Sequence, residues 1–271
     1  MSARWNPVRT ARSTARDIRL AWILTDDLRS RLRLGVDVVL YRILRLTNLP
    51  RRGRERTIRC LEGARVSYRL NRGDIETIRQ VLFDEVYRLP FDLTTSSVVD
   101  LGANIGLTSL WLHRRYGFQR AIAVEPSAAN ARLAIRNLDE NRIPATVIQA
   151  AVSGREGEAL FVPGREPNLG RIENRFPGSK SYERVQTITM SSILDEIGNS
   201  VSLVKVDIEG AESELLNDPS WLDRVEAVIV EFHPDVVDYP ALARLIESRG
   251  FRFFPVGSVY ERSTDAFLRI R

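Results

Sequence analysis

Apolar residues in the first part of the chain recur every three or four positions, which is typical of amphipathic helices. The pattern runs through residues 15–48 with arginines between the apolar positions, and Gly35 is the candidate point at which it divides into two helices. An arginine-rich polar stretch follows at residues 51–56. The pattern therefore predicts a helical N-terminal extension over residues 1–56.

Beyond this extension, short apolar runs alternate with stretches of helical periodicity. A hairpin is expected at residues 58–70 and a helix at 74–83. Strands are expected at residues 97–101, 121–124, 145–151, 201–206, 227–231 and 251–255. Helices are expected at residues 106–116, 128–141, 191–196, 212–216 and 241–249. Short, nearly all-apolar strands separated by helices predict a parallel sheet covered on both faces. Residues 57–271 are therefore expected to form one α/β domain.

Residues 163–181 interrupt this alternation, because they are rich in Gly, Pro and Asn. The stretch is longer than an ordinary connection, which makes it a candidate functional loop. We expect it to contribute, together with the N-terminal helices, the residues that contact an acceptor.

Charge is distributed unevenly along the chain. The chain has 38 Arg, 2 Lys and 35 acidic residues, for a net charge of +5. Residues 1–60 hold 15 Arg and 5 acidic residues, a balance of +10, which leaves −5 for residues 61–271. The basic character belongs to the extension, which argues against nucleic-acid binding by the whole surface. We expect the extension to pack on the body or on a second copy, giving a homodimer; contact with an anionic membrane surface is the alternative.

Cysteine content and hydropathy limit the cellular compartments in which the protein is expected. A single cysteine, Cys60, excludes a disulfide framework and a cysteine-based zinc cluster. The chain shows no apolar run of about 18 residues and no signal-peptide pattern at its start. We therefore expect a cytoplasmic protein.

The strongest chemical signal is a glycine-containing loop directly after the first core strand. Residues 100–106 read D-L-G-A-N-I-G. Ligands of open α/β sheets bind beyond the carboxyl ends of the strands. Gly102 and Gly106 are expected to let the backbone turn tightly and approach a ligand with which side chains would collide. Asp100 is expected to accept a charged amine or to order the loop through backbone N–H groups.

A second acidic residue, Glu125, stands at the end of the next predicted strand, 19 residues after Gly106. A carboxylate at this spacing reaches the ribose hydroxyls of an adenosine ligand. Dinucleotide loops usually read G-x-G-x-x-G and present a helix N-terminus to a pyrophosphate. Here Asn104 stands in place of the middle glycine. The loop therefore favours S-adenosylmethionine (SAM), a cofactor without phosphates.

Several motifs together resemble FkbM-type SAM-dependent methyltransferases. They are the loop just described, Glu125-Pro126, residues 149–152 and, most specifically, residues 204–212 (V-K-V-D-I-E-G-A-E) followed by residues 230–233 (V-E-F-H). The resemblance covers about residues 75–260. It implies the class I methyltransferase fold, an α/β architecture with a Rossmann-like seven-stranded sheet, a mixed C-terminal edge and helices on both faces. It also implies methyl transfer to hydroxyl oxygens.

The resemblance extends to the cofactor site. Tyr87 lies in the family's lead-in segment and is expected to close over the cofactor. The expected cofactor residues are Tyr87, Asp100, Gly102, Asn104, Gly106, Thr108, Glu125, Pro126, Gln149, Ala150, Ala151 and Asp207.

Two residue pairs mark the ends of the fourth and fifth core strands, Asp207 with Glu209 and Glu231 with His233. Neighbouring parallel strands end at one edge of a sheet, so both pairs are expected to face one cleft. Methyl transfer is an in-line displacement that needs a positioned acceptor oxygen and a group to take its proton. The candidate catalytic residues are Asp207, Glu209 and His233, with His233 or Asp207 as the base. Capping of the following helix is the alternative for Asp207 and Glu209.

A divalent cation is a second way to acidify a hydroxyl. In metal-dependent catechol-type O-methyltransferases, carboxylate ligands stand at the ends of the fourth and fifth core strands, where Asp207 and Glu231 fall here. Oxygen ligands of this kind suit Mg²⁺. The predicted metal ligands are Asp207, Glu231 and His233.

These residues predict a SAM-dependent O-methyltransferase with a small-molecule or oligosaccharide acceptor. A sugar hydroxyl is the preferred acceptor and a polyketide-type hydroxyl the alternative. An NAD(P)-dependent oxidoreductase is the alternative from another class; the glycine spacing and the lack of an obvious Tyr-x-x-x-Lys pair count against it. Methylation of a nucleic-acid base usually comes with [Asn/Asp]-Pro-Pro-[Tyr/Phe] after the fourth strand, where residues 207–210 read D-I-E-G. We therefore expect no DNA or RNA substrate.

Overall fold

The computed structural model describes residues 18–46, 54–162, 171–173, 182–198, 200–209, 211–233, 237–259 and 262–270. The chain forms two compact units, Met1–Asp84 and Glu85–Arg271. Most of the predicted functional loop, residues 163–181, lies outside the described residues, as does the first half of the polar stretch at 51–56.

The first unit contains two helical segments followed by a hairpin and a third helix. Residues 18–24 are helical. The remaining elements are α2 (Leu28–Leu46), β1 (Glu55–Arg59), β2 (Arg65–Arg69) and α3 (Arg72–Leu82). β1 and β2 pair antiparallel as predicted, and β1 is tied to α2 by the bond from the Arg59 amide to Ser30 Oγ, 2.9 Å. The compact unit thus continues past residue 56, the predicted end of the extension.

The helical pattern of the extension is broken at Thr25–Asp27, so the prediction that Gly35 divides it is wrong. Gly35 lies inside α2. Asp27 accepts a hydrogen bond from the Ser30 amide at 2.9 Å, which satisfies a free N–H group at the start of α2. Thr25 leaves the helix to form a bridge with Cys60. Capping chemistry, and not the glycine, decides where the helix divides.

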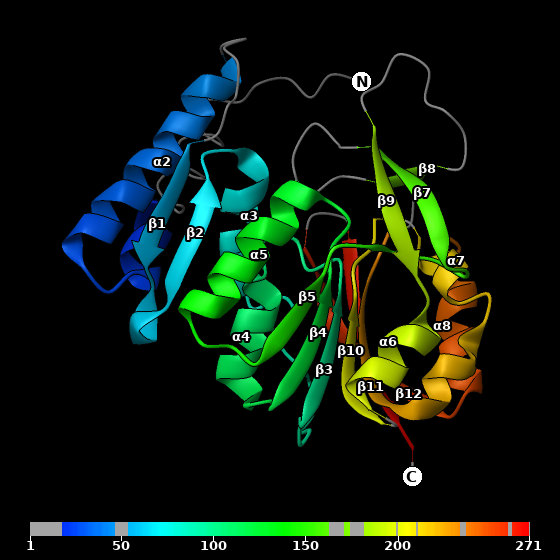
Figure 1. Ribbon diagram of the computed structural model, residues 1–271. Coiled ribbons are helices and arrows are strands. Elements are labelled where there is room, and N and C mark those ends of the chain that lie inside the picture. The colour runs from blue at the N-terminus through cyan, green and yellow to red at the C-terminus, as the bar shows by residue number, and fades with distance from the viewer. Residues whose placement is uncertain are drawn as a thin grey trace. The chain divides into compact units, whose positions relative to one another are not determined.

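The second unit is built on a seven-stranded sheet in the order β12-β13-β11-β10-β3-β4-β5 (Figure 1). Its strands are β3 (Ser97–Leu101), β4 (Arg120–Val124), β5 (Ala145–Ile148), β10 (Val201–Val206), β11 (Val225–Phe232), β12 (Phe251–Val259) and β13 (Arg262–Arg269). The five strands from β11 to β5 are mutually parallel, whereas β13 runs antiparallel to β11 and β12. This confirms the predicted α/β architecture with a mixed C-terminal edge.

Helices cover both faces of this sheet. α4 and α5 lie on one face, and α6, α7 and α8 on the other (Figure 1). Their bounds are α4 (Leu107–Tyr116), α5 (Ala128–Glu140), α6 (Met190–Ile197), α7 (Glu212–Leu215) and α8 (Tyr239–Ser248), with a short 3₁₀ segment at Pro219–Arg224. All six residues of β10 are buried, as a strand covered on both sides requires. In the described part of the chain no helix has the length and apolar character needed to cross a bilayer.

A smaller sheet in the order β6-β9-β7-β8 stands beside the main one. Its strands are β6 (Ala151–Val152), β7 (Gly157–Val162), β8 (Arg171–Glu173) and β9 (Glu183–Ile188). The predicted strand 145–151 is therefore two strands. The chain turns between them, where the Ala150 amide donates back to the Ile148 carbonyl at 3.1 Å.

Candidate active site

The predicted site residues follow strands that end side by side. Val206 of β10 pairs with Leu101 of β3 and with Val230 of β11, and Leu101 pairs with Val124 of β4. Because these strands are parallel, the segments after them leave the sheet at one edge. The structure therefore brings the cofactor loop and the two predicted residue pairs together.

Both glycines of the loop are required by the protein's own packing. Gly102 has φ +73°, and a Cβ there would lie 1.8 Å from the Asp207 carbonyl oxygen. Gly106 has φ +80°, and a Cβ there would lie 3.0 Å from Ala134 Cα. The structure thus gives a different reason for these glycines from the expected approach of a ligand: the loop is packed against the end of β10 and against α5. Asn104, also at positive φ, 49°, lies between them.

Glu125 is held at the end of β4 by the loop and by the start of α5. Its Oε2 accepts from the Asn104 amide at 2.9 Å. Its Oε1 accepts from the Ser127 amide at 3.0 Å and from Asn130 Nδ2 at 3.2 Å. The side chain is buried, and this burial raises its pKa to about 7 although the three hydrogen bonds lower it. The carboxyl group is thus fixed next to the cofactor loop.

Asp100 takes a charged amine, as expected, but the amine belongs to the chain. Its Oδ1 lies 3.1 Å from Lys205 Nζ, and its Oδ2 accepts from Ser109 Oγ at 2.7 Å. Both Asp100 and Lys205 are buried. Burial lowers the pKa of Lys205, but Asp100, Asp207 and other carboxylates outweigh it and raise that pKa above its ordinary value. Asp100 therefore orders the loop through its ion pair with Lys205 and its hydrogen bond from Ser109.

Tyr87 is buried under the carboxylates. Its hydroxyl lies 3.0 Å from Asp207 Oδ2 and 3.1 Å from Glu231 Oε2 and shares its one proton between these two acceptors. Burial and these two carboxylates raise the pKa of Tyr87 well above its ordinary value, so the hydroxyl stays protonated as a donor. Tyr87 thus contacts both carboxylates, and its expected closure over the cofactor stays a prediction.

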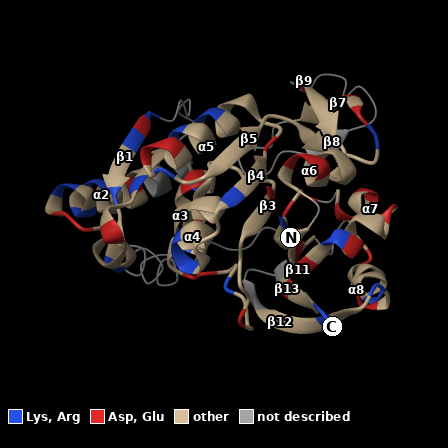
Figure 2. Ribbon diagram, turned by 60° about the horizontal axis from the view of Figure 1, so that its bottom comes forward, with Lys and Arg blue, Asp and Glu red and all other residues tan. Residues whose placement is uncertain are grey.

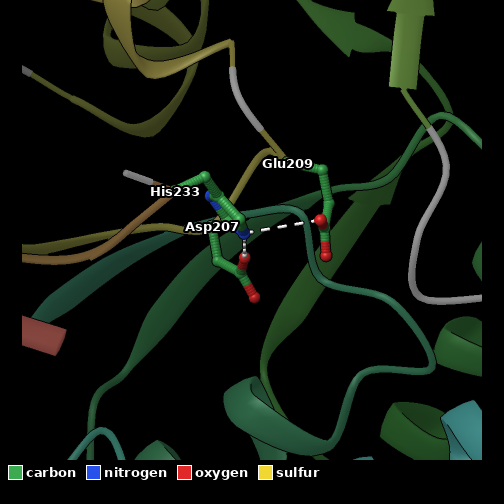
Figure 3. Close-up of side chains that lie close together, drawn as sticks. All are labelled: Asp207, Glu209 and His233. Carbon is green, nitrogen blue, oxygen red and sulfur yellow. Dashed lines mark ion pairs between the residues drawn. The ribbon is translucent and has the colours of Figure 1, made fainter. Parts of the chain in front are cut away.

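Asp207, Glu209 and His233 form a compact cluster (Figure 3). His233 Nε2 lies 3.8 Å from Asp207 Oδ1 and 3.4 Å from Glu209 Oε2. Glu209 adopts φ 50°, an uncommon conformation for a residue with a side chain. Within the described residues, His233 Nε2 and Asp207 Oδ1 are buried without a hydrogen-bond partner. Two buried polar atoms without a hydrogen-bond partner therefore lie 3.8 Å apart.

Glu212 orients the imidazole of His233 through a contact with its Nδ1 atom. Its Oε1 lies 2.8 Å from His233 Nδ1, and the side chain is fully buried at the start of α7. Burial lowers the pKa of His233, but the bond to Glu212 and the charges of Asp207 and Glu209 raise it to about 9. At neutral pH this imidazole therefore carries a proton.

The predicted metal ligands do not all meet. Asp207 and His233 lie together with Glu209, and these three side chains offer ligand atoms within 4.8 Å of one another. Glu231 instead reaches Asp207 through the shared Tyr87 hydroxyl. The other expected cofactor residues lie along the loop and the strand ends: Thr108, Ala150 and Ala151 are buried, Pro126 is half-buried and Gln149 is exposed.

Two residues of the site carry no role in the sequence prediction, Lys205 and Glu212. A lysine inside a mainly apolar strand is a signal for Lys205, because lysines are almost never fully buried without a partner. Glu212 stands in the quoted motif, but its burial under His233 depends on how α7 packs. That packing is not readable from the pattern.

The strand order, the glycine turn after the central strand and the acidic residues after its neighbours define a class I methyltransferase fold. The chain belongs to the FkbM methyltransferase family, because the family model for the methyltransferase FkbM domain matches residues 100–253, more than half of the chain. The protein is therefore a methyltransferase of the FkbM type. This confirms the predicted family and decides against an oxidoreductase.

Two relatives found by sequence similarity agree with this assignment. Methyltransferase 1 of Beauveria bassiana (strain ARSEF 2860) is 28% identical over 66% of this chain and 81% of its own length. The 31-O-demethyl-FK506 methyltransferase FkbM of Streptomyces tacrolimicus is 24% identical over 72% of this chain and 88% of its own. The crystal structure of methyltransferase FkbM from Methylobacillus flagellatus KT aligns with a TM-score of 0.46 and 14% identity over 96% of this chain. The chain spans 59% of that structure's length.

Proposed function

We propose that the protein is a SAM-dependent O-methyltransferase that methylates a hydroxyl of a sugar, an oligosaccharide or a related natural product. The cluster of Asp207, Glu209 and His233 carries this proposal, because it stands at the sheet edge that also holds the cofactor loop. A polyketide-type hydroxyl is the second acceptor class. It is favoured by the relative from Streptomyces tacrolimicus, whose name refers to a 31-O-demethyl substrate.

The residues beyond β3 and β4 fit the adenosine part of SAM. Each carboxylate oxygen accepts about two hydrogen bonds. Glu125 Oε1 already accepts two and Oε2 accepts one, so Oε2 has capacity for a ribose hydroxyl. When bound, SAM supplies an electrophilic methyl group on a sulfonium sulfur. A cofactor without phosphates suits a loop whose buried charges, Asp100 and Lys205, already neutralise each other.

The cluster supplies the proton acceptor. Methyl transfer forms a carbon–oxygen bond on the acceptor, breaks the carbon–sulfur bond and releases the hydroxyl proton. Asp207 is the favoured base, because His233 carries a proton at neutral pH and faces Asp207 Oδ1. The positive imidazole then stabilises the alkoxide that develops as the proton leaves. The Glu209 carboxylate, 3.4 Å from His233 Nε2, is a further negative charge beside the positive imidazole.

The same cluster fits a divalent cation once His233 Nε2 has lost its proton, because a metal ligand must offer a free lone pair. Two carboxylates and an imidazole nitrogen match the ligands of Mg²⁺ or Mn²⁺ sites, and Glu212 holds the second ring nitrogen as outer-shell carboxylates do in metal sites. The orphaned Nε2 and Oδ1 atoms fit this occupant. We propose Asp207, Glu209 and His233 as its ligands, in place of the set with Glu231. Such an ion would acidify the acceptor hydroxyl.

A groove with both polar and apolar lining residues is a candidate site for an extended acceptor. It has a volume of about 1220 Å³ and is lined by β7, β9, α6, α7 and the 3₁₀ segment. Glu214 of α7 belongs to its wall, two residues after Glu212, which contacts His233. Arg155, Arg184 and Asp218 also line the groove. Charged and hydroxyl groups of this kind bind sugar hydroxyls by hydrogen bonds.

A screen with labelled SAM tests the function. We expect label to pass to members of a panel of glycosides and polyketides, and to be lost in Asp207→Ala and His233→Ala. Transfer RNA and duplex DNA serve as the nucleic-acid arm, with no incorporation above the Asp207→Ala background. Calorimetry that detects no binding of SAM or of its product S-adenosylhomocysteine (SAH) would refute the proposal, as would incorporation into nucleic acid at the rate seen with a glycoside.

Chelation tests the cation separately. We expect turnover of the purified protein to fall after EDTA treatment and to return with Mg²⁺ or Mn²⁺. Glu209→Gln should weaken Mn²⁺ binding by about tenfold or more, while Glu231→Gln changes it less. Full turnover after chelation would end the cation proposal and leave Asp207 as the base.

A further inference from the structure

Lys205 is a charged residue at the centre of the sheet. It stands on β10 between β3 and β11, and its side chain is 1% exposed. A buried ammonium is costly unless it is paired and hydrogen-bonded. The groups that contact Lys205 therefore indicate the role of its charge.

One ammonium group serves both halves of the site. Nζ donates to the carbonyl oxygens of Leu101 at 3.0 Å and Gly102 at 2.8 Å, where the cofactor loop turns. It lies 3.1 Å from Asp100 Oδ1 and 3.8 Å from Asp207 Oδ2. The same ammonium group thus hydrogen-bonds the cofactor loop and lies within ion-pair distance of the carboxylate of the candidate base.

Tyr87 completes this arrangement on the carboxylate side. The Lys205 ammonium lies over the Tyr87 ring, 5.3 Å from its centroid, and the Tyr87 hydroxyl donates to Asp207 Oδ2. Tyr87 thus holds Oδ2 of Asp207 by a hydrogen bond, and Lys205 attracts the same oxygen electrostatically from 3.8 Å. The other oxygen, Oδ1, is left facing His233.

The stability of the fold alone does not explain the buried ion pair of Lys205 and Asp100. Replacing a buried ion pair with apolar or neutral side chains of similar volume is often neutral or stabilising. Lys205 and Asp100 stand opposite each other in the strand register, so both could be replaced together. The pair is therefore better explained by what it orients than by the stability it contributes.

We propose that Lys205 is a positioning residue that couples the cofactor loop to the candidate base. It fixes the turn at Leu101–Gly102 for SAM and holds Asp207 with Oδ1 toward the acceptor side. The inference rests on the proposed function, and it adds a residue that acts through others without touching substrate.

The test compares three variants of the full chain. Asp100→Asn serves as the reference, because the amide still accepts from Ser109. Asp100→Asn with Lys205→Met removes the ammonium without leaving a buried unpaired carboxylate. Ser202→Ala is the control for structural loss, because Ser202 is a buried residue at the other end of β10 whose hydroxyl bonds to Ser96. Melting temperature, SAH affinity by calorimetry and kcat on the acceptor found by the glycoside screen are measured for each.

We expect the double variant to melt near the Asp100→Asn reference, yet to bind SAH about tenfold more weakly and to turn over about 10- to 100-fold more slowly at saturating SAM. Ser202→Ala should melt lower while keeping SAH affinity and kcat. A double variant with the SAH affinity and kcat of the reference would overturn the role of Lys205 alone. A wild-type chain that binds no SAH would overturn the proposed function and this inference together. If no acceptor is found, SAH affinity decides.

Discussion

At the scale of single residues, Glu125 links the chemistry of the cofactor site to pH. Its carboxyl group has a pKa of about 7 because it is buried, and only the ionised form accepts hydrogen bonds with both oxygens. We expect SAH affinity to rise as pH increases from 6 to 8, with an apparent pKa near 7. Calorimetry over that range checks this, with Glu125→Gln as the control; a flat profile in the wild type would contradict it.

The same shift has a consequence for stability with a definite sign. The folded-state pKa of Glu125 is raised above the ordinary value of 4.5, so the protonated carboxyl favours the folded state. Its contribution is complete below about pH 4.5 and is lost as pH rises through about 7, on the order of 3 kcal/mol in all. Urea denaturation should show a shallower decline over this range in Glu125→Gln than in the wild type.

Glu212 gives a second prediction at this scale. It holds His233 Nδ1 at 2.8 Å, so Glu212→Gln removes a charge while keeping an oxygen that accepts a hydrogen bond. We expect turnover to fall about 10- to 100-fold, as it does when outer-shell carboxylates are lost. Proton NMR of the imidazole should show a pKa below the wild-type value of about 9. Glu247→Gln, at an exposed glutamate on α8, is the control; equal losses in both variants would argue against this role.

At the scale of elements, the turn after β3 is the most sensitive segment. A Cβ at Gly102 would meet the Asp207 carbonyl oxygen at 1.8 Å, and the residue has φ +73°. We expect Gly102→Ala to lower the free energy of unfolding by about 3 kcal/mol or more, since backbone strain and overpacking act together. Gly154→Ala, where a Cβ meets nothing within 4 Å, should change it by less than about 0.5 kcal/mol. Denaturant titration of both variants checks the difference.

The strands that the sequence predicts well share one property. β3 and β10 are predicted to the residue because every position in them is apolar or buried and turns bound them. β13 is missed because Thr264 and Asp265 interrupt its apolar run, although both are buried in the sheet. β9 is missed because it holds no continuous apolar run, whereas β7 is missed although it ends in the apolar run of residues 159–162.

The site is predictable in part for the same physical reason. Residues that follow parallel strands meet at one edge whatever their side chains do, so Asp207 and His233 are found together as expected. The choice between Glu209 and Glu231 depends on backbone rotation after the strand. Glu209 turns toward His233 through its positive φ, which no spacing rule predicts.

At the scale of the whole molecule, an apolar face of the first unit predicts self-association. Leu28, Leu32 and Val36 follow one another at four-residue spacing on α2 and are 53 to 61% exposed, while basic residues lie along the same helix (Figure 2). We expect a homodimer by sedimentation velocity and a monomer for Leu32→Glu. Ile135→Glu, an exposed apolar residue on α5, should leave the dimer intact. A monomeric wild type that floats with anionic vesicles would favour the membrane alternative.

The small sheet has a property that reaches beyond this chain. β6 and β9 pair side by side in parallel. The two ends of the segment between Val152 and Thr187 are therefore neighbours in the small sheet. Replacing this segment with the equivalent segment of a relative would join ends that are already neighbours, at little cost in loop-closure entropy. Chimeric proteins made at this junction would offer a route to new acceptors with an untouched nucleoside pocket.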